Sequence, residues 1–313
     1  MRRTPRFVAV AVAAALALTG CGSGGGTENG GTPPDTDISR AADFPVTVGD
    51  LTLEAKPERI VALSPTATEV LFAIGAGPQV VAVDDQSNYP PEAPKSDLSA
   101  FQPNAEAIAQ KQPDLVVLSN DMNNVVAQLT QLKIPVYLAA AGKTLDDTYR
   151  QITDIGALTG NRPAAEDLAK RMRDEIDKLV KDVPQRDEKL TYYYELGPEL
   201  YSLTSQTFVG SLFAMLGMEN VADAADADGS KGGYPQLAAE SLVKADPDMI
   251  FLADTVCCKQ NAETVKARPG WSGMTAVKTG QIVELNDDIA SRWGPRTVDL
   301  LRAIADAVAK VPA

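Results

Sequence analysis

Short runs that are apolar at every position alternate with amphipathic stretches from residue 59 to the end of the chain. The apolar runs predict strands at 60–63, 80–83, 115–118, 135–138, 190–196, 249–252 and 282–285. The intervening stretches predict helices at 66–74, 104–110, 125–132, 145–158, 208–216, 237–244, 262–266, 271–277 and 297–310. A strand that is apolar throughout is buried on both faces, so this alternation predicts parallel sheets covered by helices on both sides.

Two shorter segments with a different pattern come before this region. Residues 46–48 and 51–53 alternate apolar and polar side chains on either side of Gly49-Asp50. Two residues of this type form the tight turns that connect antiparallel strands. We therefore expect a β-hairpin at 46–53.

The most strongly patterned helix is predicted at 163–183, between Pro163 in its first turn and Pro184 after its end. Apolar residues recur along it at spacings of four, four, three and four, on one face: Leu168, Met172, Ile176, Leu179 and Val183. A helix of this size is about 30 Å long, which is enough to connect two lobes. The pattern alone also fits an ordinary crossover helix within one sheet.

An internal repeat favours two lobes. Residues 104–119 align without a gap on 238–253, at an offset of 134. The identical residues include Glu106 with Glu240, Pro113 with Pro247, and Asp114 with Asp248. A helix, a Pro-Asp turn and a strand are common together in α/β proteins, so coincidence is the competing explanation, but identities at one offset favour similar lobes. We predict an α/β fold with two Rossmann-like lobes, at 44–160 and 185–313, bridged by a helix at 161–184.

Composition narrows the functional classes. The chain has 313 residues, 44% of them hydrophobic, which is enough to fill two cores. Its net charge of −13 argues against nucleic acid or anionic lipid as a partner, because both require Lys and Arg to replace counterions. The sequence contains no histidine, which excludes His-based catalytic triads, imidazole bases and the commonest zinc sites.

The N-terminal segment predicts export. Residues 1–20 contain three arginines, an apolar run at 7–18 and then small residues, as secretory signals do. Twelve apolar residues are too few to span a bilayer. The sequence Leu-Thr-Gly-Cys ending at Cys21 resembles the bacterial lipobox, in which the cysteine is diacylated. We expect Cys21 to be the lipid anchor on the outer face of the cytoplasmic membrane, followed by a flexible linker to residue 43 that is rich in Gly, Thr and Pro.

Two α/β lobes place a ligand in the cleft between them, against loops at the carboxyl ends of the strands. Four aromatic residues lie in or near such loops: Phe101, Tyr201, Tyr234 and Trp293. We expect them to stack on a large, flat or amphipathic ligand. The alternative is that each of these side chains fills the core of its own lobe.

Adjacent cysteines follow the strand predicted at 249–252. Cys257 and Cys258 form a vicinal disulfide in one interpretation of an exported protein, and remain thiols in the other. No third type of metal ligand lies near them in the sequence. We therefore expect them to shape their loop, and we expect no catalytic role and no metal site.

Six segments together resemble the substrate-binding proteins of ABC importers for ferric siderophores, haem and cobalamin. They are RIVALSPTATEVLFAIGAG at 59–77, SNYP at 87–90, PDLVVLS at 113–119, MLGMENVAD at 215–223, YPQLAAESLVKADPDMIFLA at 234–253 and WGPR at 293–296. They occur in the family's order and spacing. The resemblance implies a class III periplasmic binding protein fold, with two lobes joined by one long helix.

The resemblance also implies contacts with a permease dimer. In that family one glutamate on each lobe enters an arginine pocket on a permease subunit, and the matching residues here are Glu69 and Glu219. A carboxylate in the first turn of a helix also stabilises the helix dipole, which is the structural alternative for Glu69.

Similarity to the cobalamin-binding member implies ligand stacking at Phe101, Tyr201 and Tyr234. It also places Trp293 to Arg296 on a loop of the cleft. Arg296 is expected to pair either with a carboxylate of the ligand or with a partner on its own lobe.

The expected function is that of a non-enzymatic, monomeric receptor without a cofactor. It captures a ferric siderophore, a related iron chelate or haem, and delivers it to the ABC permease. The cleft loops contain few arginines, which disfavours naked ferric citrate. Because histidine is absent, haem would have to be ligated by tyrosine or held without a bond from the protein to its iron.

Three alternatives stay open at this point. The first is a receptor of the same family for cobalamin or another corrinoid. The second is a receptor for free ferric ion or another metal. The third is an exported enzyme, although the sequence contains no nucleophile-elbow motif or P-loop.

Overall fold

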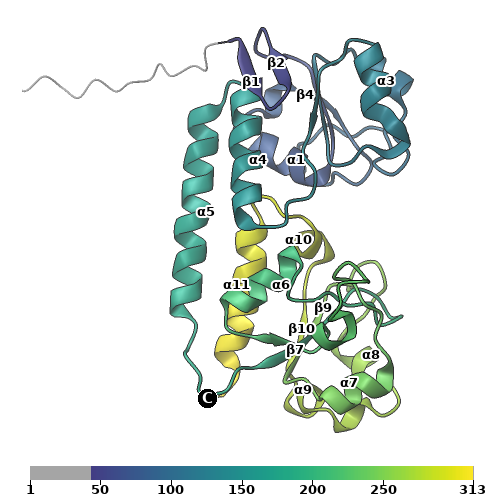
Figure 1. Cartoon of the computed structure of the whole chain (residues 1–313), viewed down its shortest axis with the longest axis vertical. Coiled ribbons are helices and arrows are strands. Elements are labelled where there is room, and N and C mark those ends of the chain that lie inside the picture. Colours follow the sequence, from purple (N-terminus) through teal and green to yellow (C-terminus); the bar gives the residue numbers. More distant parts are fainter. Residues whose placement is uncertain (1–43, 313) are drawn as a thin grey trace, which may run out of the picture. The chain divides into compact units, whose positions relative to one another are not determined.

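Two separate four-stranded parallel sheets form the framework of the chain (Figure 1). The structure is a computed structural model that describes residues 44–312. Predictions for the signal segment, Cys21 and the linker therefore lie outside the described residues. None of the described helices combines the length and the apolar character needed to cross a membrane.

The N-terminal lobe contains a hairpin and the first sheet. Its strands are β1 (Val46–Val48), β2 (Leu51–Leu53), β3 (Ile60–Leu63), β4 (Val80–Val83), β5 (Leu115–Leu118) and β6 (Val136–Leu138). Its helices are α1 (Pro65–Ala73), α2 (Ala105–Ala109), α3 (Val125–Gln131) and α4 (Leu145–Leu158), with short 3₁₀ turns at Gly77–Gln79 and Met122–Asn124. β1 and β2 pair antiparallel, as the turn at Gly49-Asp50 predicts, and the sheet order is β4-β3-β5-β6.

The C-terminal lobe contains the second sheet. Its strands are β7 (Thr191–Glu195), β8 (Glu219–Asn220), β9 (Met249–Leu252) and β10 (Ile282–Glu284). Its helices are α6 (Phe208–Met215), α7 (Ala239–Ala245), α8 (Ala262–Lys266), α9 (Thr275–Thr279), α10 (Asp287–Ser291) and α11 (Thr297–Lys310), with 3₁₀ turns at Asp223–Asp226 and Trp271–Gly273. The sheet order is β10-β9-β7-β8.

The two sheets have the same topology. Read from β8, the second order becomes β8-β7-β9-β10, which corresponds strand for strand to β4-β3-β5-β6. The repeated segments supply β5 and β9, which occupy equivalent interior positions. The aspartates shared by the two segments make equivalent hydrogen bonds. Asp114 accepts the backbone N–H groups of Glu58 and Arg59 at 2.8 and 2.9 Å. Asp248 accepts the backbone N–H and the hydroxyl of Thr191, both at 2.8 Å. Each carboxylate thus fixes the start of the neighbouring strand, which accounts for the repeated Pro-Asp pair.

Helices cover both faces of each sheet, as the uniformly apolar strands predict. Alternate residues of the inner strands enter different clusters. In the first sheet, Val61 and Val116 pack under α2 and α3, while Ile60 and Leu115 pack toward α1 and α4. In the second sheet, Tyr193 packs under α7 to α9.

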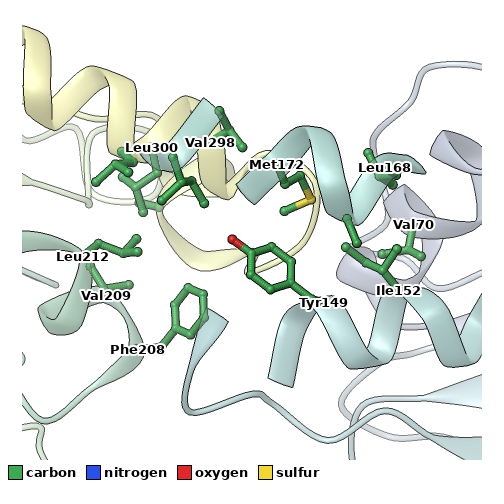
Figure 2. Packing of buried hydrophobic residues seen from close by; sticks show 14 of the residues in the cluster. Val70, Tyr149, Ile152, Leu168, Met172, Phe208, Val209, Leu212, Val298 and Leu300 are labelled. Atoms are coloured by element: carbon green, nitrogen blue, oxygen red, sulfur yellow. The ribbon is translucent and has the colours of Figure 1, made fainter. Parts of the chain in front are cut away.

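The long helix α5 (Arg162–Asp182) belongs to neither sheet. It packs along α4 of the N-terminal lobe and α11 of the C-terminal lobe (Figure 1). Its apolar face joins the two lobes through one continuous cluster, in which Ile152 of α4, Met172 of α5 and Leu212 of α6 are members (Figure 2). Burial of a Leu, Ile or Met side chain contributes about 1.5–3 kcal/mol, so this shared core holds the lobes together along the α5 side.

Three elements differ from the expected pattern. The region predicted as one helix at 271–277 is a 3₁₀ turn followed by α9, because Met274 between them has extended backbone angles. The two-residue strand β8 and the five-residue helix α10 had not been predicted, since neither is long enough to show a period.

Candidate functional site: a pocket between the lobes

A pocket of about 360 Å³ lies where the two lobes meet. The N-terminal lobe supplies residues at the carboxyl ends of its strands, the first turn of α1 and one side of α4. The C-terminal lobe supplies α10 and the segment after it. The lining residues that carry polar groups or aromatic rings are Ser64, Thr66, Gln86, Phe101, Ser119, Thr148, Gln151, Asp288, Ser291, Arg292 and Trp293. The carboxyl edge of a parallel sheet is the usual position of a ligand site in such folds.

A buried carboxylate connects the lobes beside this pocket. Glu69 on α1 is 2% exposed. Its Oε2 accepts a hydrogen bond from Nε of Arg296 at 2.9 Å, and its Oε1 accepts from Nη2 of Arg296 at 2.5 Å and from Nη1 of Arg292 at 3.3 Å. The bonded carboxylate raises the pKa of Arg296 above its usual value. A bidentate arginine fixes both the distance and the orientation of its partner.

Arg292 extends the connection to a second site on the N-terminal lobe. It donates to Asp288 at 2.7 Å, to the side-chain oxygen of Asn88 at 2.6 Å and to the carbonyl of Gln86 at 3.0 Å. Asn88 in turn donates to Asp288 at 2.8 Å. We call Glu69, Asn88, Asp288, Arg292 and Arg296 the inter-lobe ion cluster. It contains two guanidinium and two carboxylate groups, so its formal charges cancel.

The inter-lobe ion cluster changes two interpretations drawn from the sequence. Arg296 pairs with a carboxylate on the opposite lobe, whereas the structural alternative from the sequence was a partner on its own lobe. Its guanidinium also lies 4.3 Å from the centre of the Tyr89 ring. The docking role expected for Glu69 does not fit this conformation, because a docking carboxylate must be exposed and this one is buried between two arginines.

The candidate docking residue of the other lobe is placed differently. Glu219 begins the edge strand β8, and 59% of its side chain is exposed. Its one ionic partner among the described residues is the exposed Lys189, at 3.3 Å. Such a surface pair contributes little to stability, so Glu219 is free to exchange partners.

The four aromatic candidates fall into two groups. Phe101 lines the pocket and is 63% exposed, which excludes a role in the core. Trp293 lines the same pocket, but its ring stacks on Phe208 with centroids 4.9 Å apart, so it forms a fixed part of the wall. Tyr201 and Tyr234 are exposed on adjoining segments of the C-terminal lobe, outside the pocket.

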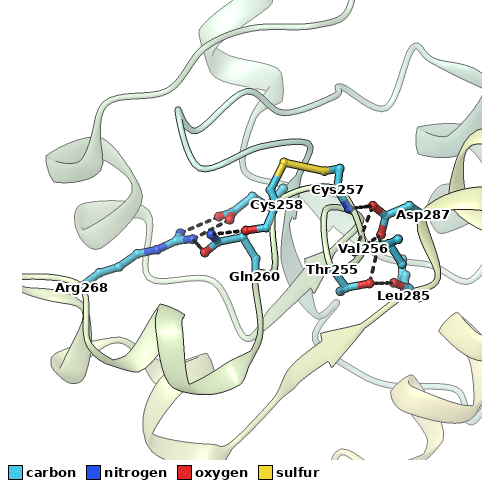
Figure 3. Close-up of a disulfide and its surroundings, with 9 residues drawn as sticks. Thr255, Val256, Cys257, Cys258, Gln260, Arg268, Leu285 and Asp287 are labelled. Carbon is cyan, nitrogen blue, oxygen red and sulfur yellow. Dashed lines mark hydrogen bonds and ion pairs between the residues drawn. A yellow bond between two sulfur atoms is a disulfide. The ribbon is translucent and has the colours of Figure 1, made fainter.

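The loop after β9 is fastened to the pocket wall. Cys257 and Cys258 are joined by a disulfide (Figure 3). The carboxylate of Asp287, the first residue of α10, accepts the backbone N–H of Val256 at 2.9 Å and that of Cys257 at 2.8 Å. These bonds couple the loop to α10, which also carries Asp288 of the inter-lobe ion cluster.

A buried acidic pair lies beneath this loop. Glu195, the last residue of β7, accepts hydrogen bonds from Nη1 and Nη2 of Arg268, both at 2.6 Å. Asp254, just after β9, is fully buried, and neither of its carboxylate oxygens has a hydrogen-bond partner. Burial, and secondly the charge of Glu195, raise the pKa of Asp254 to about 7. Within residues 44–312, no group of three or more His, Cys, Asp or Glu side chains is arranged to hold a metal ion.

Sequence reasoning missed the contribution of α4 to the pocket. Gln151, Ile152 and Ile155 line it, but in the sequence they are ordinary members of an amphipathic helix. The sequence did contain one sign of the inter-lobe ion cluster. Glu69 is the one charged residue in the segment 65–74, and an isolated charge on an apolar helix requires a partner when it is buried.

Comparison with known proteins identifies related chains. The profile of the periplasmic binding protein family matches residues 60–289. The chain is 29% identical to the uncharacterized ABC transporter substrate-binding lipoprotein YvrC of Bacillus subtilis, over 89% of this chain and 91% of that protein. It is 32% identical to a cobalamin-binding protein of Halobacterium salinarum, over 87% and 76% of the two chains. A solved structure from Staphylococcus epidermidis, described as a possible iron-binding (periplasmic solute-binding) protein, superposes with a TM-score of 0.71 at 26% identity, covering 82% of this chain and all of that one.

The first prediction concerns the inter-lobe ion cluster. We expect the Glu69→Gln variant to lose about 3–5 kcal/mol of its free energy of unfolding, because Arg296 loses its carboxylate partner and the buried Arg292 loses one of its two. Urea titration followed by circular dichroism measures this change. Glu106→Gln is the control. Glu106 is a helix carboxylate like Glu69, but it lies in the first turn of α2 and is exposed, so its change stays within about 0.5 kcal/mol. Equal, small changes in both variants would contradict the stabilising role of the inter-lobe ion cluster.

The second prediction concerns pH. The pKa of Asp254 is about 7 in the folded protein and ordinarily 3.8, so folding favours its neutral form. This contribution to stability is complete below pH 4 and is lost as the pH rises to 7. The free energy of unfolding of the wild type should therefore fall across this window relative to that of Asp254→Asn. A difference between the two proteins that stays constant from pH 4 to 7 contradicts the prediction.

Proposed function

We propose a function on the following premise: this chain belongs to the periplasmic binding protein family. It acts as the substrate-binding protein of an ABC importer, and it captures its ligand between the lobes without making or breaking a covalent bond. The pocket carries this proposal, because both lobes line it at the carboxyl edge of the first sheet. A ligand that contacts both walls is enclosed by the protein and can be handed to a permease.

We propose a corrinoid as the ligand. Among the described residues that line the pocket, the charged ones are Asp288 and Arg292, and these two are bonded to each other. The remaining lining offers hydroxyl and amide groups beside the apolar surfaces of Phe101 and Trp293. This chemistry suits a ring that carries neutral amide groups at its edge, as cobalamin does, better than a polyanionic chelate. The relative that is 32% identical and named as cobalamin-binding supports the same choice.

Size gives the proposed binding mode. A complete corrinoid is larger than a pocket of about 360 Å³. We therefore place one edge of the ring in the pocket, against Phe101. The remainder extends toward the exposed rings of Tyr201 and Tyr234 on the C-terminal lobe, where stacking stabilises large apolar faces.

The second candidate is the iron chelate or haem expected from the sequence. The observation that favours it is the exposure of three phenol groups on the loops of the two lobes, in Tyr89, Tyr201 and Tyr234. A phenolate oxygen can ligate ferric iron where histidine is absent. A similar solved structure, from Staphylococcus epidermidis, is described as a possible iron-binding protein.

The proposed partners follow from the same premise. A relative named as a lipoprotein supports a lipid anchor at Cys21, and hence a position on the outer face of the cytoplasmic membrane. The receptor acts as a monomer, and its exposed Glu219 enters an arginine pocket of the permease. For Glu69 the same role requires the inter-lobe ion cluster to open first.

Titration calorimetry tests the ligand. We expect saturable binding of cyanocobalamin, and weaker or no binding of haemin and ferrichrome. Phe101→Ala should weaken cyanocobalamin binding about tenfold, because a stacking surface is lost. The control Leu132→Ala removes an exposed apolar side chain outside the pocket and should leave the affinity unchanged. Binding of ferrichrome or haemin alone would select the second candidate, and binding of none of the three would refute the receptor function.

Uptake assays test the docking role of Glu219. We expect Glu219→Gln to reduce uptake of labelled cyanocobalamin by cells about tenfold, since one charged partner of the docking contact is lost. Its affinity for the ligand in solution should not change. Glu188→Gln, which alters a nearby exposed carboxylate, is the control and should transport normally. A parallel loss of ligand affinity in Glu219→Gln contradicts docking.

A further inference from the structure

The tip of the loop after β9 is apolar and exposed. Val256 is 56% exposed, and Cys257 beside it is exposed as well. Val256 contributes two methyl groups to the tip, and the disulfide joins the exposed Cys257 to the half-buried Cys258. A single exposed valine is ordinary on a protein surface, so exposure by itself indicates nothing. The support beneath the tip is what distinguishes it.

The backbone of this loop is held from two sides (Figure 3). On one side Asp287 accepts the N–H groups of Val256 and Cys257, and the hydroxyl of Thr255 donates to the carbonyl of Leu285 at 2.7 Å. On the other side the side-chain amide of Gln260 donates to the carbonyl of Cys258 at 3.2 Å. Several backbone polar groups of the loop are thus bonded within the protein, and the apolar atoms of Val256 remain at the surface beside the exposed Lys259.

Arg268 secures the second side of the loop. Its Nη2 donates to Gln260 at 2.8 Å while the guanidinium binds the buried Glu195. The Asp254 carbonyl also accepts the N–H of Cys258 at 3.2 Å. A loop fixed in this way loses little conformational entropy when a ligand contacts it, which is the property of a preorganised contact surface.

The position of the tip connects it with the pocket. It follows β9, whose carboxyl end lies at the same sheet edge as that of β10 and the helix α10 after it. Asp287 of α10 holds the tip, and the next residue, Asp288, lines the pocket and bonds to Asn88 of the N-terminal lobe. The tip and the pocket wall are therefore successive parts of one hydrogen-bonded surface.

We propose that Val256 and the Cys257–Cys258 disulfide form a contact surface of the C-terminal lobe for the apolar face of a ring-shaped ligand, while Phe101 contacts that ligand from the N-terminal lobe. This inference rests on the proposed function and adds specificity-determining residues to it. The ligand class is a macrocycle with an apolar face. Sulfur is polarizable and packs well against such rings, and the disulfide keeps both sulfur atoms in place.

The test compares affinities of the full-length purified protein for cyanocobalamin by titration calorimetry. We expect Val256→Ser to weaken binding about fivefold to twentyfold, from the loss of buried apolar area in the complex. Val256→Leu should restore the affinity to near that of the wild type. Val243→Ser is the matched control, because Val243 is an exposed valine of the same lobe on α7, and it should bind normally.

The disulfide is tested separately. Alkylation under non-reducing conditions, followed by mass spectrometry, should leave Cys257 and Cys258 unmodified in the wild type. The double variant Cys257→Ser/Cys258→Ser should bind cyanocobalamin at least about fivefold more weakly. Modification of both cysteines without reductant overturns the role of the disulfide.

The outcomes separate this inference from the proposed function. If the wild type binds cyanocobalamin and Val256→Ser binds equally well, the contact surface is refuted and the receptor function stands. If the wild type binds none of cyanocobalamin, haemin and ferrichrome, both proposals fail. Because Val256 is exposed, its substitution leaves the folded core intact, and a change in its affinity reports on ligand contact.

Discussion

The arrangement of the binding site depends on one buried carboxylate. Transfer of Glu69 out of water costs several kcal/mol, and a bidentate arginine with a second guanidinium offsets this cost only when the geometry is maintained. Both arginines lie in the segment 292–296 of the C-terminal lobe, whereas Glu69 lies on α1 of the N-terminal lobe. The segment 292–296, which supplies both arginines, also forms part of one wall of the pocket. The shape of the pocket is therefore set by an ionic contact between the lobes.

A second constraint acts on the other side of the molecule. The apolar face of α5 joins the cores of both lobes through α4 and α11, so the lobes cannot separate there without exposing apolar surface (Figure 2). The inter-lobe ion cluster has no such apolar support, and water can replace its bonds. Any opening of the pocket should therefore begin at the ion cluster, with α5 as the fixed side. This is the behaviour that a receptor requires, because the ligand must enter and leave without unfolding the protein.

The sequence predicted the framework well because local patterns encode it. Runs of apolar residues marked the strands, and the repeated Pro-Asp pair marked two lobes whose strand order is the same. The site was less predictable, because Glu69 and Arg296 are 227 positions apart and no period links them. For Phe101, the aromatic side chain and its loop position predicted a place at the pocket. For Trp293 it was not sufficient, since stacking on Phe208 could be seen only in three dimensions.

Hydrogen–deuterium exchange of the full chain, with and without cyanocobalamin, tests most directly whether the ligand is held between the lobes. The account predicts slower exchange on both sides of the pocket: in residues 64–67 of the N-terminal lobe, and in 254–258 and 287–294 of the C-terminal lobe. Exchange in α5 should not change, because α5 lies on the side away from the ligand. Protection confined to one lobe, or found only outside these segments, would contradict capture between the lobes.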